Sequence, residues 1–163
     1  MALVLNEEQQ MLKTSAKEFL AENAPVEALR KLRDSKDPKG YDPALWAQMT
    51  ELGFAGIAIP EEYGGMGFGY TGLGQVLEET GRTLTASPLI SSVLLSATLI
   101  NLAGNEHQKA ALLPAIADGN LLVSVANEES NAHKPLAAET RFRKSSKGYS
   151  ITGTKKFVLE GGT

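Results

Sequence analysis

The stretch SPLISSVLLSATLINLA, residues 87 to 103, is the most apolar part of the chain and decides the fold. Ser87 is suited to cap a helix and Pro88 to start it. The apolar residues then cover more than one helical face: Leu89, Ile90, Val93, Leu94, Ala97 and Ile100. Serine, threonine and asparagine interrupt the run, which is too short for a membrane span. We therefore predict a buried helix at the centre of an antiparallel helical bundle.

Shorter amphipathic segments lie on both sides of this stretch. Asn6 with Gln9, and Asn105 with Gln108, are spaced as capping boxes that begin the first and last helices. The first helix should end before Pro25, and the last should be interrupted at Pro114. The chain between them predicts three more helices, over Val26 to Leu32, Asp42 to Leu52 and Tyr70 to Gly81.

The periodicity changes after Gly119. Extended chain is favoured at LLVSVA (121–126), around Thr140 and Phe142, and at TGTKKFVL (152–159), with SSKG (145–148) as a hairpin turn. The predicted fold class is α+β with two domains: a helical bundle over residues 1–119, and the beginning of a β-sheet or barrel domain over 120–163. Three or four strands would leave an open sheet edge, so we expect this second domain to be incomplete.

The stretch GFGYTG, Gly67 to Gly72, has the G-x-G-x-x-G spacing of dinucleotide-binding loops. Such a loop joins a strand directly to a helix, whereas here PEEYGGM separates it from the nearest apolar run. Glu61 and Glu62 would also repel a pyrophosphate. We interpret the glycines as positions that permit positive φ.

Composition excludes several function classes. The chain has 163 residues, is 42% hydrophobic and has a net charge of −3, so we expect no nucleic-acid partner. Without cysteine it has neither disulfides nor thiolate ligands, which suits a cytoplasmic location. His107 and His133 are too isolated to predict a zinc site. Adjacent acidic pairs, including Glu78/Glu79 and Glu128/Glu129, are typical of solvated surface, and no G-x-S-x-G nucleophile motif is present.

Several phrases, in order along the chain, resemble the N-terminal part of the acyl-CoA dehydrogenase family of flavoenzymes. They are LNEEQQMLKTSAKEFLAENA (5–24), LWAQMTELGFAGIAIPEEYGGMGFGY (45–70), LEETGR (77–82), GNEHQKAALLPAIADGN (104–120) and GYSITGTKKFVLEGG (148–162). No single phrase is decisive, but their succession is specific.

The resemblance implies α,β-dehydrogenation of an acyl-CoA thioester by FAD, with helices and sheet enclosing an apolar slot. It implies that the catalytic base lies in a C-terminal domain, so no residue here is named as catalytic, and the fragment alone should be inactive. An acceptor similar to electron-transfer flavoprotein and a homo- or hetero-oligomer are the expected partners. No metal is expected.

Two phrases that would face the flavin depart from the family pattern. Where relatives carry a T-E-P-x-x-G-S-D-like phrase, residues 127–134 read NEESNAHK, which leaves Val125, Ala126 and Asn127 as main-chain contacts to FAD. The second phrase, W-I-T or W-I-S in relatives, is here Phe157, Val158 and Leu159. Phe157 can still pack on a ring, but Leu159 offers no hydroxyl. Two alternatives therefore stay open: a half-site partner subunit with weakened flavin binding, or a helical interaction domain.

Overall fold

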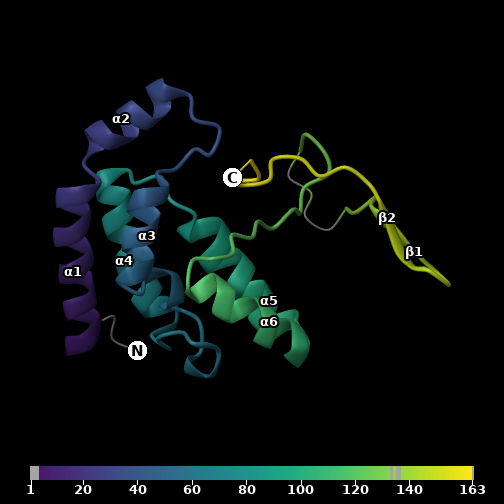
Figure 1. Ribbon diagram of the computed structural model, residues 1–163, viewed down its shortest axis with the longest axis horizontal. Helices are drawn as coiled ribbons and strands as arrows, with labels where there is room; N and C mark the ends of the chain where they lie inside the picture. The colour runs from purple at the N-terminus through teal and green to yellow at the C-terminus, as the bar shows by residue number, and fades with distance from the viewer. Residues whose placement is uncertain (1–3, 133, 135–136, 163) are drawn as a thin grey trace.

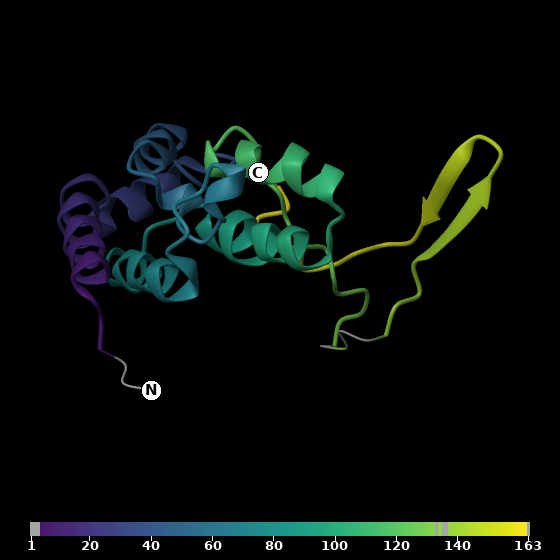
Figure 2. The same cartoon turned by 90° about the horizontal axis from the view of Figure 1, so that it is seen from below.

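The computed structural model of the chain describes residues 4–132, 134 and 137–162. The elements, in chain order, are α1 (Glu7–Asn23), α2 (Val26–Ser35), α3 (Pro43–Glu51), the 3-10 turns η1 (Phe54–Gly56) and η2 (Glu61–Tyr63), α4 (Gly69–Thr83), the π-helix η3 (Leu89–Ala97), α5 (Thr98–Ala103), α6 (Glu106–Ala117), β1 (Arg141–Ser145) and β2 (Gly148–Thr152). The helices gather on one side, and the β1–β2 hairpin projects away from them (Figure 1). Figure 2 shows the same separation after a 90° turn.

Local capping chemistry sets the helix boundaries largely as the sequence predicts. Both capping boxes are present: Asn6 accepts from the amide of Gln9 at 2.7 Å, and Asn105 accepts from that of Gln108 at 2.9 Å. Helix α1 ends at Asn23, ahead of Pro25. Pro114 lies inside α6 without ending it, contrary to the predicted interruption.

The central apolar stretch forms a helix, but its first half is a π-helix rather than an α-helix. Pro88, not Ser87, is the residue before its first turn. The hydroxyl of Ser96 donates to the carbonyl of Ser91 at 2.7 Å, five residues back, which matches the wider π spacing. None of the helices in the described part of the chain combines the length and hydrophobicity that a membrane crossing requires.

The hydrophobic core lies within the helical part. Its fully buried large side chains include Leu20, Met49, Phe54, Ile57, Ile59, Leu73, Val76, Leu89, Val93, Leu113 and Ile116. Helix α1 packs along α4, and the ring of Phe54 meets that of Phe19 edge-on at 6.0 Å. Every hydrophobic side chain classed as buried in the described residues lies between Ala16 and Ala117.

The Gly67–Gly72 loop is not preceded by a strand. The turn η2 precedes it, α4 begins inside it at Gly69, and both Gly67 and Gly69 have positive φ. The side chain of Glu61 lies directly against Gly67, where an added Cβ would be 3.3 Å from its Cγ. Gly67 and Gly69 thus adopt the positive φ that the sequence analysis expects of this loop.

The region after Gly119 contains less sheet than predicted. Its described residues form one antiparallel pair, β1–β2, with Arg141 opposite Thr152 and Ser145 opposite Gly148, so the predicted hairpin turn is confirmed. The strand predicted at 121–126 is wrong: this segment is extended but pairs with no strand among the described residues. The described residues form no barrel.

Candidate functional site

Two buried serines of η3 fix the extended segment that the sequence analysis assigned to a strand. The hydroxyl of Ser92 accepts from the amide of Val123 at 3.1 Å, and that of Ser96 donates to the Val123 carbonyl at 2.8 Å. Both serines are almost fully buried. They pair both backbone groups of Val123, its N–H and its C=O, and so fix this part of the segment to η3 without a neighbouring strand.

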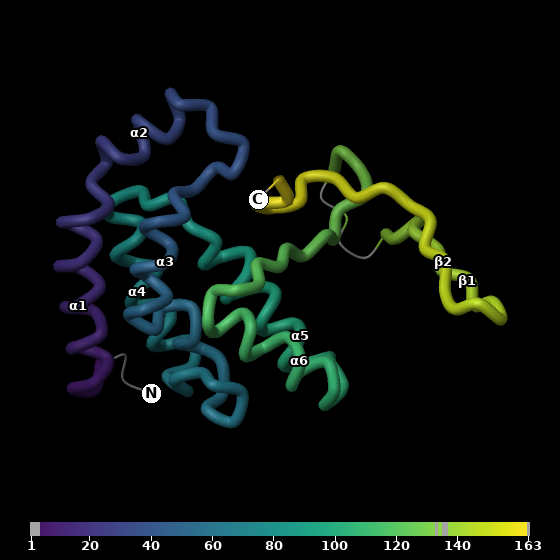
Figure 3. Tube along the Cα trace, viewed as in Figure 1, coloured from purple at the N-terminus to yellow at the C-terminus, as the bar shows by residue number. Residues whose placement is uncertain are grey.

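The structure brings together the two segments predicted to face the flavin. The amide of Lys156 donates to the carbonyl of Glu128 at 2.7 Å, and the ammonium of Lys155 lies 3.2 Å from the carbonyl oxygen of Asn127. Figure 3 traces the chain from the hairpin back towards the helical part, where the C-terminus lies. These two contacts place the end of segment 125–127 beside the start of segment 157–159, although 29 residues separate the two segments in sequence.

The first segment presents three main-chain donors. Among the described residues, the amides of Val125, Ala126 and Asn127 have no hydrogen-bond partner. Val125 and Ala126 line a hollow of about 210 Å³ whose opposite wall comes from Ser96, Leu99 and Ile100. Consecutive unpaired amides beside an apolar wall suit the polar edge of a planar ligand.

The second segment, residues 157–159, offers an exposed aromatic ring but no side-chain donor. Phe157 adopts positive φ (51°) and is 75% exposed, so its ring is available to a ligand. Val158 is half-buried, and Leu159 is 46% exposed and carries no donor. A turn stabilised by Glu160 follows: its carboxylate accepts from Ser91, and its carbonyl accepts from the Ser124 hydroxyl at 3.4 Å. This turn holds the segment against η3.

Glu129 anchors the base of the hairpin, and the prediction that it is solvated is wrong. Its side chain is 7% exposed and accepts from Lys155 at 2.6 Å and from the amides of Glu139 and Thr140. The Lys155 ammonium, aided by these amides, lowers the pKa of Glu129 to about 2. A carboxylate with so low a pKa is too weak a base to abstract a substrate proton.

Glu79 is also buried, contrary to its predicted solvated place. Its side chain is 2% exposed and pairs with Arg82, which bridges it to Glu78, while Lys13 of α1 reaches Glu78 at 2.7 Å. These groups form an ion-pair network between α1 and α4. They are therefore structural rather than part of the flavin-facing pair of segments.

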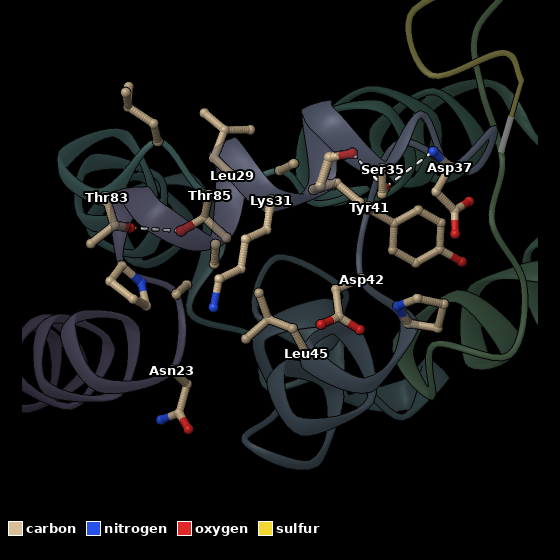
Figure 4. Close-up of a pocket in the computed structure, with 17 residues that line it drawn as sticks. Asn23, Leu29, Lys31, Ser35, Asp37, Tyr41, Asp42, Leu45, Thr83 and Thr85 are labelled. Carbon is tan, nitrogen blue, oxygen red and sulfur yellow. Dashed lines mark hydrogen bonds between the residues drawn. The ribbon is translucent and has the colours of Figure 1, made fainter.

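A separate hollow lies beneath α2 (Figure 4). It measures about 340 Å³ and is lined mainly by apolar side chains from α2, the ends of α1 and α4, and the start of α3, with Lys31 and Asp42 among its polar groups. None of the six predicted site residues lines it. No residue of α2 is buried, so Leu29 and Leu32 line the hollow without packing tightly on the core.

The described residues contain no cluster of three histidine, aspartate or glutamate side chains that could hold a metal ion. His107 is exposed at the start of α6, and His133 lies outside the described residues. The site residues that sequence reasoning missed are Ser92, Ser96 and Lys155. The two serines recur at i and i+4 within an apolar run, which is a signal for a buried polar contact; Lys155 has no comparable signal.

Comparison with known proteins assigns the family. The family model described as the acyl-CoA dehydrogenase N-terminal domain matches residues 6–120. Acyl-CoA dehydrogenase FadE12 of Mycobacterium tuberculosis is 33% identical over 162 residues, covering 96% of this chain and 40% of the relative. The chain therefore spans less than half of that relative's length.

Solved structures agree in fold. One described as the electron transferring flavoprotein of Acidaminococcus fermentans has a TM-score of 0.86 at 33% identity and covers 99% of this chain and 42% of its own. Acyl-CoA dehydrogenase complexed with FAD from Bacillus anthracis has a TM-score of 0.81 at 27% identity, and the match covers 94% of this chain and 27% of that chain. The ChsE4–ChsE5 complex from Mycobacterium tuberculosis has a TM-score of 0.83 at 25% identity (97% and 42%). The chain thus belongs to the acyl-CoA dehydrogenase family, with the family's N-terminal domain over residues 6–120.

Proposed function

We propose that this chain is the N-terminal portion of an FAD-dependent acyl-CoA dehydrogenase and supplies one wall of its active site. The observation that carries the proposal is the row of unpaired amides at Val125, Ala126 and Asn127, held beside the second flavin-facing segment. Residues 1–119 act as the helical domain in this proposal, and residues 120–163 as the start of the β domain.

Each part of the site has a binding role. The three amides donate to the polar edge of the flavin, and the exposed ring of Phe157 packs on its face. The apolar wall formed by Leu99 and Ile100 excludes water from the acyl chain. Bound FAD supplies the hydride acceptor for α,β-dehydrogenation of an acyl-CoA thioester. Glu129 is committed to Lys155 and backbone amides. The resemblance to the family implies that the proton-abstracting base lies in a C-terminal domain.

The amide row is tested by replacing Ala126. We expect Ala126→Pro, which removes one unpaired N–H, to weaken FAD binding in a fluorescence titration, whereas the control Ala126→Ser retains the amide and should bind like wild type. Because this N–H has no partner in the described fold, thermal unfolding of the helical part should be unchanged. Equal FAD affinity of the two variants would contradict the assigned contact.

The second segment is tested at Leu159. A polar ligand edge without its partner costs about 1–3 kcal/mol, so Leu159→Thr should tighten FAD binding by about 5- to 150-fold. Leu159→Val has the shape of threonine without its hydroxyl and should not reproduce the gain. FAD binding by Leu159→Thr that is no tighter than binding by Leu159→Val would contradict the contact assigned to this segment.

We further propose that the 163-residue chain does not dehydrogenate acyl-CoA by itself. Its partners are then the acyl-CoA substrate, an acceptor similar to electron-transfer flavoprotein, and further subunits in a homo- or hetero-oligomer. Dye-linked turnover of a range of acyl-CoA thioesters by the purified chain should be absent. Measurable turnover that persists in repurified protein would contradict the missing base.

A half-site subunit is the second candidate, favoured by Leu159 and by similarity to a chain of a two-component complex. In that case the chain contributes a wall to a flavin bound mainly by a partner. Leu159→Thr should then leave FAD affinity of the isolated chain undetectable, while Ala126→Pro would still weaken flavin retention in the reconstituted complex.

A further inference from the structure

The β1–β2 hairpin has two chemically different faces. Paired residues alternate across the ribbon, so Arg141, Arg143, Ser150 and Thr152 share one face, and Phe142, Lys144, Tyr149 and Ile151 share the other. The second face is internally paired: the rings of Phe142 and Tyr149 are 6.3 Å apart, and the Lys144 ammonium lies 5.8 Å from the centre of the Tyr149 ring. The first face forms part of a hollow.

This hollow measures about 650 Å³, a volume typical of small-molecule sites. The two arginines and the Ser150 and Thr152 residues of the ribbon line one side, and Glu129, Glu139, Thr140 and Thr154 are among the residues that complete it. Within the described part of the chain, the side chains of Arg141 and Arg143 have no ion-pair or hydrogen-bond partner. Two guanidinium groups are therefore held two residues apart on one face, with five donors each.

Charge balance favours an anion in this hollow. Glu129 is already neutralised by Lys155 and two backbone amides, which leaves Glu139 as the carboxylate of the lining that has no ion pair in the described residues. In the lining of the hollow, the two unpaired arginines therefore outnumber the one unpaired carboxylate, although the whole chain has a net charge of −3. Like charges side by side on a ribbon are unfavourable unless a counter-charge binds between them.

We propose that this face of the hairpin binds the phosphate group of a small molecule. A phosphate dianion can neutralise both arginines, whose planar forks bind phosphate bidentately, and the Ser150 and Thr152 hydroxyls supply further donors. The site is lined by none of the six residues proposed to face the flavin, so it is independent of the proposed function.

The test is a nuclear magnetic resonance titration of the 163-residue chain with pyrophosphate at about physiological ionic strength. We expect shifts concentrated at the amides of residues 140–143 and 150–154. The double variant Arg141→Gln/Arg143→Gln should weaken pyrophosphate binding about tenfold or more. The control Lys144→Gln removes one positive charge from the opposite face of the hairpin and should change the affinity less than about twofold. Cross-strand contacts between Phe142 and Ile151 check that the hairpin is intact in each variant.

The source of the phosphate is separated by titrating ADP and adenosine beside pyrophosphate. ADP binding at least as tightly as pyrophosphate, with adenosine inert, indicates a nucleotide; pyrophosphate binding better than ADP indicates a free phosphate ligand. Shifts spread over all surface lysines, equal losses in Lys144→Gln and the arginine variant, or no saturable binding would each overturn the proposal.

Discussion

The helical part of the chain and the region after Gly119 are stabilised by different means. Between Ala16 and Ala117 the structure buries a continuous set of apolar side chains. The described residues beyond Gly119 bury none to that degree. Leu121, Leu122 and Val123 pack partly buried against the core, and polar contacts hold the segments further on, such as that of Glu129 with Lys155. Apolar burial supports a cooperative domain, whereas polar contacts of this kind hold a segment in place without giving it a core.

Two phenylalanines give the sharpest contrast between these regions. Phe54 is 1% exposed and packs on Phe19, whereas Phe142 on the hairpin is 73% exposed. We expect Phe54→Ala to lower the free energy of unfolding by about 3–5 kcal/mol and Phe142→Ala to change it by less than about 0.5 kcal/mol. Urea unfolding followed by circular dichroism measures both. Similar losses of unfolding free energy in the two variants would contradict the contrast between the buried helical core and the exposed hairpin.

The contact between the two regions depends on Ser96. Its oxygen lies 2.7 Å from the carbonyl oxygen of Ser91 and 2.8 Å from that of Val123, and its single proton is shared between them. Ser96→Ala removes this buried donor and should cost about 1–3 kcal/mol. Amide exchange over residues 121–126 should accelerate. Ser150→Ala, on the exposed hairpin, is the control and should leave both quantities unchanged.

A smaller effect is expected at a helix end. Asn105 caps α6 through a complete capping box, so Asn105→Ala should destabilise the helical part by about 1 kcal/mol. Asn120 is exposed and makes no hydrogen bond in the described residues. Thermal unfolding of Asn120→Ala should therefore match wild type, and equal losses in the two variants would remove the capping explanation.

A response to pH, distinct from the effects above, is expected at Glu129. Its pKa is lowered in the folded chain from an ordinary value of 4.5 to about 2, so its stabilising contacts are complete above pH 4.5 and are lost as pH falls towards 2. The Thr140 amide resonance should follow this titration. Lys155→Gln should move the midpoint upward, whereas Lys156→Gln should not, because Lys156 contacts Asn131 instead. An unchanged midpoint in Lys155→Gln would contradict the assignment of the lowered pKa to the Glu129–Lys155 ion pair.

Sequence alone predicted the helical part well because its signals are local. Capping residues, prolines and apolar periodicity determine where α1, α3 and α6 begin, and these depend only on neighbouring residues. The π-helix was missed because its widened turns depend on buried contacts of Ser91 and Ser96. The strand at 121–126 was wrong for the same reason: serines from a distant helix bind its backbone.

The site was only partly predictable. Val125–Asn127 and Phe157–Leu159 came from family resemblance, and their role as flavin contacts stays a prediction. The two segments lie beside one another because Lys155 and Lys156 bind Asn127 and Glu128, contacts between residues far apart in sequence. Neither the burial of Glu129 nor the shared face of Arg141 and Arg143 could be read from composition, because both depend on how the hairpin folds back.

Amide hydrogen exchange of the 163-residue chain, with and without saturating FAD, tests the central claim most directly. We expect the helical core to exchange most slowly, residues 121–162 to exchange far faster, and FAD to slow exchange specifically at Val125, Ala126 and Asn127. Uniform protection of both regions, or FAD-dependent protection confined to the helices, would contradict the account.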